Sequence, residues 1–383
     1  MYACRKVCPS APSGLDAKSD RMKMDSQQLK NQFNESLMSV RGLLKQGIPA
    51  PEVERGTWGV DIGTDAVKVC RLDVSKQPFV LSAYVIEKVD NKNYRDALSR
   101  VLAKTGVLQN GTCVLSVSGQ GAVSRYIELP SMNKAELDSS MKFEIEKYVP
   151  FPLAEVVTDY TVLGEMKGKA KTNILIAAAK NELIHKKFTL AQELGLKVKA
   201  IDLDSLALSN FYTEIVGNPK GCACCAVINM GKTCCNMDIL VDGQPFLSRD
   251  IFVGGDDFTK KIAEMRDLDL PEAEKLKCAP QGREDELSSI WDSVLSNLTS
   301  EIRVSLDYFE SRGSKAADLV LITGGASRLC GIREYMEHAL AVDVKFLDYA
   351  DRLVLGGGID RQAFVADSDL LAVSLGLALR DAE

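Results

Sequence analysis

Three segments of this chain, far apart in the sequence, each consist of a predicted β-strand that runs into a turn containing glycine. They begin at Val60, Val227 and Leu321 and read VDIGTDAVK, VINMGKT and LITGGAS. Because glycine has no Cβ, the backbone N–H groups of such turns can reach phosphate oxygens or a ribose. One turn of this kind is weak evidence, but three in this order predict a nucleotide held between two related α/β domains.

The length and composition of the chain are compatible with that prediction. Its 383 residues are too many for one ordinary core and suit two or more domains. The net charge of −6 gives no basic field for nucleic acid, so no nucleic-acid partner is expected. The apolar run 370–379 is about half of a membrane span, and no apolar core follows the first residues. We therefore expect a soluble, intracellular protein.

Five of the eleven cysteines cluster around the second glycine turn. They are Cys222, Cys224, Cys225, Cys234 and Cys235. Their spacing is not the paired Cys-x-x-Cys of a zinc ribbon or knuckle. We favour small apolar side chains that pack on two paired strands, with a zinc site as the alternative.

The first 56 residues are predicted to form an N-terminal extension. Residues 1–25 lack periodicity and are expected to be disordered. Apolar residues then recur at steps of three and four, which predicts an amphipathic helix over 26–46. We favour a helix that packs on this protein or on a partner, with a membrane-surface helix as the alternative.

The pattern of the first half of the chain returns in the second half. Strands are expected at 58–62, 66–73, 79–86 and 112–118, with a helix at 94–104, as in a ribonuclease-H-like domain. At Ala223 the sequence of strand, glycine turn and strand begins again and runs to Val241. This internal echo predicts a duplicated α/β domain.

A different unit is predicted between the two halves, over residues 124–200. Asn133 and Glu136 form a capping box, so a helix begins there and ends before Pro150. Strands near 125–129, 156–163, 173–179 and 197–201 and a helix at 181–194 complete the unit.

The first glycine turn contains several groups that suit a nucleotide. Its N–H groups at Gly63 could hold phosphates, and the Thr64 hydroxyl adds a donor. Asp61 could hold Mg²⁺ through water, and Lys68 on the returning strand supplies a cation. Asp65 is included among the expected nucleotide-binding residues. The alternative is an ordinary β-hairpin turn, which the presence of the other two turns disfavours.

The second turn ends like a Walker A loop, at Gly231, Lys232 and Thr233. A P-loop would need glycine at 226, where the chain has Ala226, and a helix where residues 237–241 read as a strand. We therefore interpret this turn, together with Asn229, as a second phosphate-binding hairpin.

The third turn, with Gly324, Gly325 and Ser327, follows a buried strand and precedes a helix. Two glycines would let a nucleoside approach the backbone, and the alternative is a loop that needs positive φ. Gly254 and Gly255 form a fourth candidate turn near the ribose or the phosphates.

These turns match the two phosphate motifs and the adenosine motif of the actin, Hsp70 and sugar-kinase superfamily. From about Thr57 onward the chain resembles the PilM family, which comprises FtsA-like proteins of type IV pilus assembly. The segments that carry the likeness are YIELP (126–130), FEIEKYVPFP (143–152), AID (200–202), VGG (253–255), EIRVSLDY (301–308) and SLGLALR (374–380).

The resemblance implies an α/β, actin-like fold made of duplicated ribonuclease-H-like domains with an FtsA/PilM-type inserted subdomain. The implied boundaries are 57–123, 201–221 and 366–383 for subdomain 1A, 124–200 for the inserted subdomain 1C, 222–258 and 316–365 for subdomain 2A, and 259–315 for subdomain 2B. FtsA ends in a membrane-binding helix, whereas this chain ends within its core pattern, so 26–46 is the candidate for such a helix.

The resemblance also implies ligands and partners. ATP and Mg²⁺ would occupy the cleft between the domains. The cytoplasmic tail of a PilN-like inner-membrane protein would dock in a groove beside the inserted subdomain. The protein would then be cytoplasmic and peripheral at the inner membrane, within the pilus inner-membrane complex and its motors, and it could form a homo-oligomer. Where the family usually has an acidic residue, this chain has Asn229, so ATP binding could survive while hydrolysis weakens.

Three functions are compatible with these features. The first is an ATP-binding scaffold that links the pilus complex to its motors and is at most a weak ATPase. The second is a filament-forming ATPase of cell division, and the third is a small-molecule kinase. A kinase needs an aspartate base, for which the sequence offers no convincing candidate. His185 and His338 lie in predicted helices with no nucleophile nearby, so a hydrolytic triad has no support.

Overall fold

The computed structural model of the chain describes residues 56–105, 111–165, 170–219, 222–280, 282–312 and 316–381. The predicted helix at 26–46 and the rest of the N-terminal extension up to residue 55 lie outside these ranges. Within them, no helix is both long enough and apolar enough to cross a membrane.

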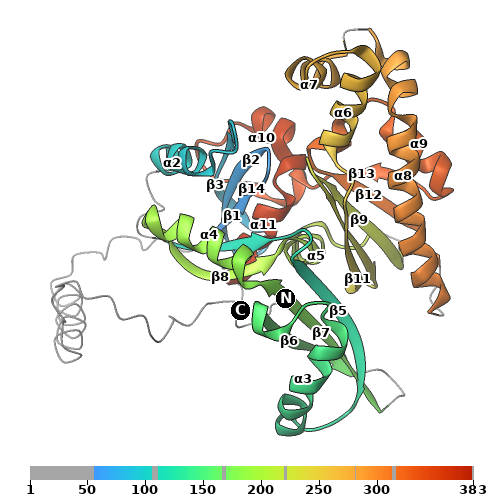
Figure 1. Cartoon of the computed structure of the whole chain (residues 1–383). Coiled ribbons are helices and arrows are strands. Elements are labelled where there is room, and N and C mark those ends of the chain that lie inside the picture. The colour runs from blue at the N-terminus through green and yellow to red at the C-terminus, as the bar shows by residue number, and fades with distance from the viewer. Residues whose placement is uncertain are drawn as a thin grey trace, which may run out of the picture. The chain divides into compact units, whose positions relative to one another are not determined.

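The first half is built on a six-stranded sheet with the strand order β14-β3-β2-β1-β4-β8 (Figure 1). Its strands are β1 (Trp58–Ile62), β2 (Ala66–Asp73), β3 (Val80–Lys88), β4 (Thr112–Val117), β8 (Lys197–Leu203) and β14 (Val354–Leu355). The β2 strand is antiparallel to both of its neighbours, β1 and β3, while β4 runs parallel to both β1 and β8. The helices α2 (Tyr94–Thr105) and α4 (Asn181–Glu193) share a hydrophobic cluster with this sheet.

The second half repeats this topology in a five-stranded sheet with the order β11-β10-β9-β12-β13. Its strands are β9 (Cys224–Met230), β10 (Cys235–Val241), β11 (Gln244–Ile251), β12 (Leu319–Thr323) and β13 (Val344–Phe346). The three strands β9, β10 and β11 are antiparallel, and β12 runs parallel to both β9 and β13. Strand for strand, this matches β1, β2, β3, β4 and β8, so the predicted duplication is confirmed.

The helices of the second half share one hydrophobic cluster with its sheet. They are α6 (Gly255–Arg266), α7 (Leu270–Cys278), α8 (Glu284–Ser311) and α9 (Ile332–Leu340). Phe258 of α6 and Trp291 of α8 are buried in that cluster together with Ile228 of β9. The predicted subdomain 259–315 therefore has no hydrophobic core separate from the sheet among the residues described.

The inserted unit is a three-stranded antiparallel sheet, in the order β5-β7-β6, with one covering helix. It consists of β5 (Ala122–Pro130), α3 (Lys134–Tyr148), a short 3₁₀ turn (Leu153–Glu155), β6 (Val156–Glu165) and β7 (Lys171–Lys180). The predicted capping box is present, because Asn133 and Glu136 exchange both side-chain-to-backbone hydrogen bonds. The structure differs from the prediction that the inserted unit ends at residue 200. That point lies inside β8, which pairs with β4 and so belongs to the first sheet.

Two short helices, α5 (Asp204–Phe211) and α11 (Ala372–Ala378), pack against each other and against the sheets. The helix α11 contacts β1 and β2, and α5 contacts β10 and β11, so α5 lies between the two sheets (Figure 1). The helix α11 lies very close to β1, since a Cβ on Gly59 would lie 1.9 Å from the Ser374 carbonyl oxygen. It lies equally close to α5, since a Cβ on Gly376 would lie 1.9 Å from the Ala207 carbonyl oxygen. The remaining helical segments are Tyr212–Val216, Gly325–Arg328, Ala350–Arg352, α10 (Arg361–Asp367), Ser368–Leu370 and Leu379–Asp381.

Three of the five clustered cysteines pack as we favoured from the sequence, while Cys222 and Cys234 are half-buried. Cys224 and Cys235 are buried in the cluster of the second half, and Cys225 is buried in the cluster between the sheets. In the described part of the chain, no group of three or more His, Cys, Asp or Glu side chains could hold a metal ion.

Candidate nucleotide-binding site

The three glycine turns meet around one cavity of about 620 Å³. Each turn follows the carboxyl end of a strand, β1, β9 or β12, and the cavity lies at these ends. The predicted residues that line it are Asp61, Gly63, Thr64, Asp65, Lys68, Asn229, Gly231, Lys232, Thr233, Gly255, Gly324 and Gly325. Gly254 and Ser327, which were also predicted, are not among the lining residues. The cavity is within the range of about 300–1,000 Å³ that is usual for small-molecule sites.

The first turn carries a buried ion pair. The register of β1 and β2 places Asp61 opposite Lys68, and the Lys68 ammonium donates to the Asp61 carboxylate at 2.9 Å. Burial lowers the pKa of Lys68, but the Asp61 charge and hydrogen bond outweigh it, so the pKa is raised overall. The Gly63 N–H donates to the Ala66 carbonyl at 3.1 Å and closes the turn. The first turn therefore presents a fixed, charged pair to the cavity.

The second turn has the same backbone but carries amides in place of the ions. The Gly231 N–H donates to the Cys234 carbonyl at 3.0 Å, as Gly63 does in the first turn. Asn229 lies opposite Asn236, in the positions that Asp61 and Lys68 hold in the first half. The Asn229 Nδ2 donates to the Asn236 Oδ1 at 3.1 Å. No ion pair joins these two positions, so the second turn is neutral there.

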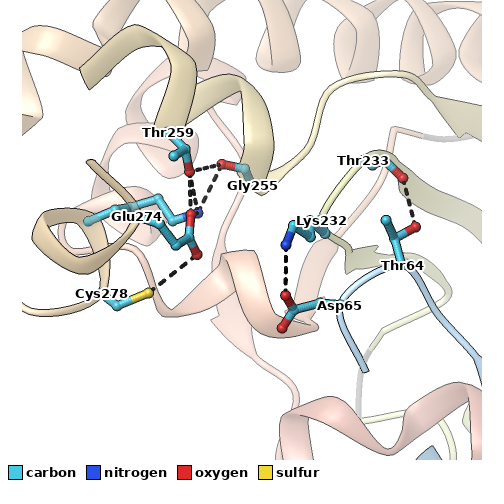
Figure 2. Close-up of polar contacts among 9 residues, drawn as sticks. Thr64, Asp65, Lys232, Thr233, Gly255, Thr259, Glu274 and Cys278 are labelled. Atoms are coloured by element: carbon cyan, nitrogen blue, oxygen red, sulfur yellow. Dashed lines mark hydrogen bonds and ion pairs between the residues drawn. The ribbon is translucent and has the colours of Figure 1, made fainter. Parts of the chain in front are cut away.

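The first and second glycine turns touch each other across the cavity. Figure 2 shows Lys232 facing Asp65 and Thr233 facing Thr64. The Lys232 ammonium donates to Asp65 at 2.9 Å, and the two threonine hydroxyls lie 3.3 Å apart. Burial lowers the pKa of Lys232, but the hydrogen bond to Asp65 and its charge outweigh it, so the pKa is raised overall. Each turn uses its first residue after glycine to contact the second such residue of the other, as expected for two repeats.

Close packing at Gly254, Gly324 and Ser327 holds the turns in position. A Cβ on Gly254 would lie 2.6 Å from the Lys232 carbonyl oxygen, so the α6 end packs directly on the second turn. Gly324 has φ of +90° and lies equally close to Met230 of that turn. The Ser327 hydroxyl is buried and donates to the Gly324 carbonyl at 2.7 Å. In this structure the Ser327 hydroxyl therefore bonds within its own turn, and its ligand role stays a prediction.

A cluster on α6 and α7 also lines the cavity and was missed from the sequence. The Lys277 ammonium donates to the Gly255 carbonyl at 3.0 Å and to the Thr259 hydroxyl at 2.8 Å, and it pairs with Glu274 at 2.7 Å. Figure 2 labels these three partners, Gly255, Thr259 and Glu274. Burial raises the pKa of Glu274, but Lys277 and Thr259 outweigh it, so the pKa is lowered overall. A Glu-x-x-Lys spacing is ordinary on any helix, so only the fold marks these residues as part of the site.

Two more charged residues of the cavity were missed. Asp204 begins α5, directly after β8, and its carboxylate is close enough to Lys68 to raise the lysine pKa. Arg328 follows the third turn and pairs with Asp369 at 2.5 Å. Neither residue belongs to a glycine turn, so the feature that located the site could not locate them.

A second, smaller hollow of about 300 Å³ lies beside the inserted unit. We call it the groove. One wall comes from the end of β4, the following loop and the start of β5 (residues 117–120 and 122–125). The other lining residues are 150–151, 203–205, Ser248, Arg249, Asp250 and Phe252. Ser118, Gly119 and Asp204 line both the groove and the cavity, so the two hollows share walls.

The duplicated sheets, with paired glycine turns around one cavity, define an actin-like fold with an inserted subdomain. A family model described as type IV pilus assembly protein PilM matches residues 59–382. The chain therefore belongs to the PilM family, as its sequence motifs predicted.

Two solved structures support this fold. One is described as the PilM-PilN type IV pilus biogenesis complex, with 24% sequence identity, a TM-score of 0.73, and coverage of 87% of this chain and 100% of that chain. The other is ethanolamine utilization protein EutJ from Carboxydothermus hydrogenoformans, with 14% identity, a TM-score of 0.52, and coverage of 91% of this chain and 98% of that chain.

Proposed function

We propose that this protein is an ATP-binding scaffold of type IV pilus assembly, which docks the cytoplasmic tail of a PilN-like inner-membrane protein. The observation that carries the proposal is the meeting of all three glycine turns around one cavity. The family description and the description of the first similar structure support the pilus role and the partner. The scaffold would be cytoplasmic and held at the inner membrane through its partners, between the pilus complex and its motors.

The chemistry of the cavity suits a nucleoside triphosphate. Lys68, Lys232 and Lys277 supply cations, and the turns bring backbone close to where phosphates would lie. Glu274 is an acceptor that could bind ribose hydroxyls. Mg²⁺ is usually held by one or two carboxylates together with phosphate oxygens and water, and Asp61 and Asp204 fit that role.

Hydrolysis is expected to be weak at most. Asn229 points its Nδ2 toward Asn236, and an amide cannot take a proton from water at neutral pH. ATP would then act as a ligand that favours one arrangement of the cleft, by binding that arrangement more tightly.

The groove is the proposed docking site for the tail. It lies between the inserted unit and the second half, and it combines the aromatic rings of Phe151 and Phe252 with the charges of Arg125 and Arg249. A short segment with apolar and charged side chains would suit this lining, because aromatic and arginine side chains are the usual anchors of interfaces.

The test is calorimetric titration of the full chain with ATP and Mg²⁺, repeated for Asp61→Asn. We expect a dissociation constant on the order of micromolar, weakened about tenfold or more in the variant. Glu146→Gln, an exposed position on α3, is the matched control and should bind as the unaltered chain does. Thermal unfolding would confirm that each variant is folded. No binding by the intact chain would reject the nucleotide-binding part of the proposal.

A further inference from the structure

A chain of three hydrogen bonds leads from the nucleotide cavity to the groove. The Asn229 Nδ2 donates to the Asn236 Oδ1 at 3.1 Å, and the Asn236 Nδ2 donates to the Asp250 Oδ1 at 2.8 Å. The other carboxylate oxygen, Asp250 Oδ2, accepts the backbone N–H of Gly119 at 2.7 Å. The chain thus crosses from β9 through β10 and β11 to a loop of the first half.

The residues of this chain belong to both hollows. Asn229 and Asn236 line the nucleotide cavity, Asp250 lines the groove, and Gly119 lines both. Gly119 lies in the loop between β4 and β5, through which the first sheet continues into the inserted unit. Its φ of +92° is a backbone conformation that favours glycine. Asp250 of the second half therefore holds the loop that forms one wall of the groove.

The carboxylate of Asp250 also sets the orientation of both amides. An ionised carboxylate only accepts hydrogen bonds, so the buried Asn236 must turn its NH₂ group toward Asp250. This leaves the Asn236 oxygen facing Asn229, which in turn must donate. An aspartate at 229 would face that oxygen with a second acceptor. The amide at 229 and the carboxylate at 250 are therefore a matched pair.

Comparison with the first half shows what this pair replaces. Asp61 and Lys68 occupy the positions of Asn229 and Asn236, and there the carboxylate lies in the turn itself. In the second half the carboxylate lies on β11, at the groove. The Asp250 carboxylate can therefore accept hydrogen bonds from Gly119 in the groove wall and from Asn236 in the cavity at the same time.

We propose that Asp250 is a positioning residue that couples the two sites, so that a nucleotide in the cavity and a tail in the groove alter each other's affinity. This inference rests on the proposed function. A nucleotide that moves the Asn229 amide must disturb Asn236, then Asp250, and then the Gly119 hydrogen bond. The coupling is reciprocal, so a tail that moves Gly119 must alter nucleotide affinity by the same factor.

The hydrogen-bond chain itself is tested by a charge relocation. In Asn229→Asp/Asp250→Asn every bond can form again with the amides reversed: Asn236 donates to position 229, position 250 donates to Asn236, and position 250 still accepts from Gly119. Each single substitution should lower the affinity for AMPPNP with Mg²⁺ about tenfold, and the double variant should recover most of the loss. A double variant as weak as the product of the two single variants would overturn the proposal.

The coupling is tested with two probes, AMPPNP with Mg²⁺ and a synthetic peptide with the sequence of the PilN-like protein's N-terminal tail from the same genome. The full chain should bind the peptide about fivefold or more differently when AMPPNP is saturating. In Asp250→Ala this factor should fall to near one, while the exposed Gln244→Ala on the same strand should leave it unchanged. Thermal unfolding would show that both variants are folded.

The outcomes separate this inference from the function on which it rests. If the intact chain binds neither probe, the proposed function fails and the coupling fails with it. If it binds both but the coupling factor is near one, or is the same in Asp250→Ala, the scaffold function stands and only the role of Asp250 is overturned.

Discussion

The first and second glycine turns share a backbone conformation and differ in charge at two equivalent positions. Gly63 and Gly231 close their turns with equivalent hydrogen bonds, at 3.1 and 3.0 Å. In the first turn a carboxylate and an ammonium face each other, whereas in the second turn two amides do. The difference teaches that the duplicated strands place side chains at equivalent positions, while the residue types at those positions decide whether an ion pair or an amide pair forms. The first turn therefore carries an ion pair at these two positions, and the second turn is neutral there.

The largest expected effect comes from removing the cation of the first turn. Lys68→Met would leave the Asp61 carboxylate, whose side chain is 8% exposed, without its ion-pair partner. Breaking a buried pair in this way costs about 3 kcal/mol of stability. Urea denaturation at neutral pH measures the loss. The double variant Asp61→Asn/Lys68→Met should regain much of it, and a double variant that is no more stable than Lys68→Met would show that the pair is not the cause.

The next largest effect tests the contact between the second and third turns. In Gly324→Ala the new Cβ would lie 2.6 Å from the Met230 carbonyl oxygen, on a backbone with positive φ. Such overpacking costs about 1–3 kcal/mol and should also weaken ATP binding. Gly325→Ala is the matched control, because its Cβ would meet only the Leu370 Cδ2, at 3.5 Å. Equal stability of the two variants would contradict the close packing described above.

A third prediction compares equivalent buried groups, Cys70 on β2 and Asp238 on β10. Burial raises the pKa of Asp238 well above its usual 3.8, so the folded state binds more protons than the unfolded state above that pH. The contribution of Asp238 to the free energy of unfolding is therefore largest at low pH. It falls as pH rises, by up to about 1.4 kcal/mol per pH unit, until the pH passes the pKa of Asp238 in the folded state. Asp238→Asn should remove this fall, which thermal unfolding between pH 4 and 8 would detect.

Cys70→Ala is the control for that comparison. Burial raises the pKa of the Cys70 thiol to about 12, so the thiol stays neutral over the same pH range. Its substitution should shift stability equally at every pH. A wild-type protein with the same pH dependence as Asp238→Asn would show that Asp238 is not the group responsible.

The smallest effect is expected for the ion pair that joins the two turns. Lys232 and Asp65 have side chains that are 32% and 48% exposed, so their pair is screened by solvent. A cycle of Lys232→Met and Asp65→Asn should give a coupling energy of about 0.2–1 kcal/mol that shrinks in high salt. A coupling energy larger than that between Asp61 and Lys68 would contradict this ranking of the two ion pairs.

The sequence predicted the fold and the turns well, because these depend on local patterns. Alternating strands and the glycine positions at 63, 231 and 324 are visible without knowledge of the sheet order. Glu274 and Lys277 were missed, since a helix of ordinary composition becomes part of the site only through its place beside Gly255. Asp250 and Asn236 were missed for a similar reason, because their contact depends on which strands pair.

The end of the inserted unit shows the same limit. Residues 197–201 were predicted correctly as a strand, but a strand pattern does not say which sheet it joins. The pairing of β8 with β4 is a contact between residues about 85 positions apart, and it places the strand in the first half. Gly254 was likewise recognised as special, and its lack of a Cβ makes room for the Lys232 backbone.

The packing of α11 against β1 has a consequence for biosynthesis. The first half is interrupted in the sequence by the second, and its last parts are β14, α11 and the buried pair of Arg380 with Asp202, at 3.0 Å. A ribosome makes β1 early and α11 more than 300 residues later. On the nascent chain, the second half can therefore finish folding first, while the surface of β1 that receives α11 stays open to chaperones until synthesis has passed Arg380.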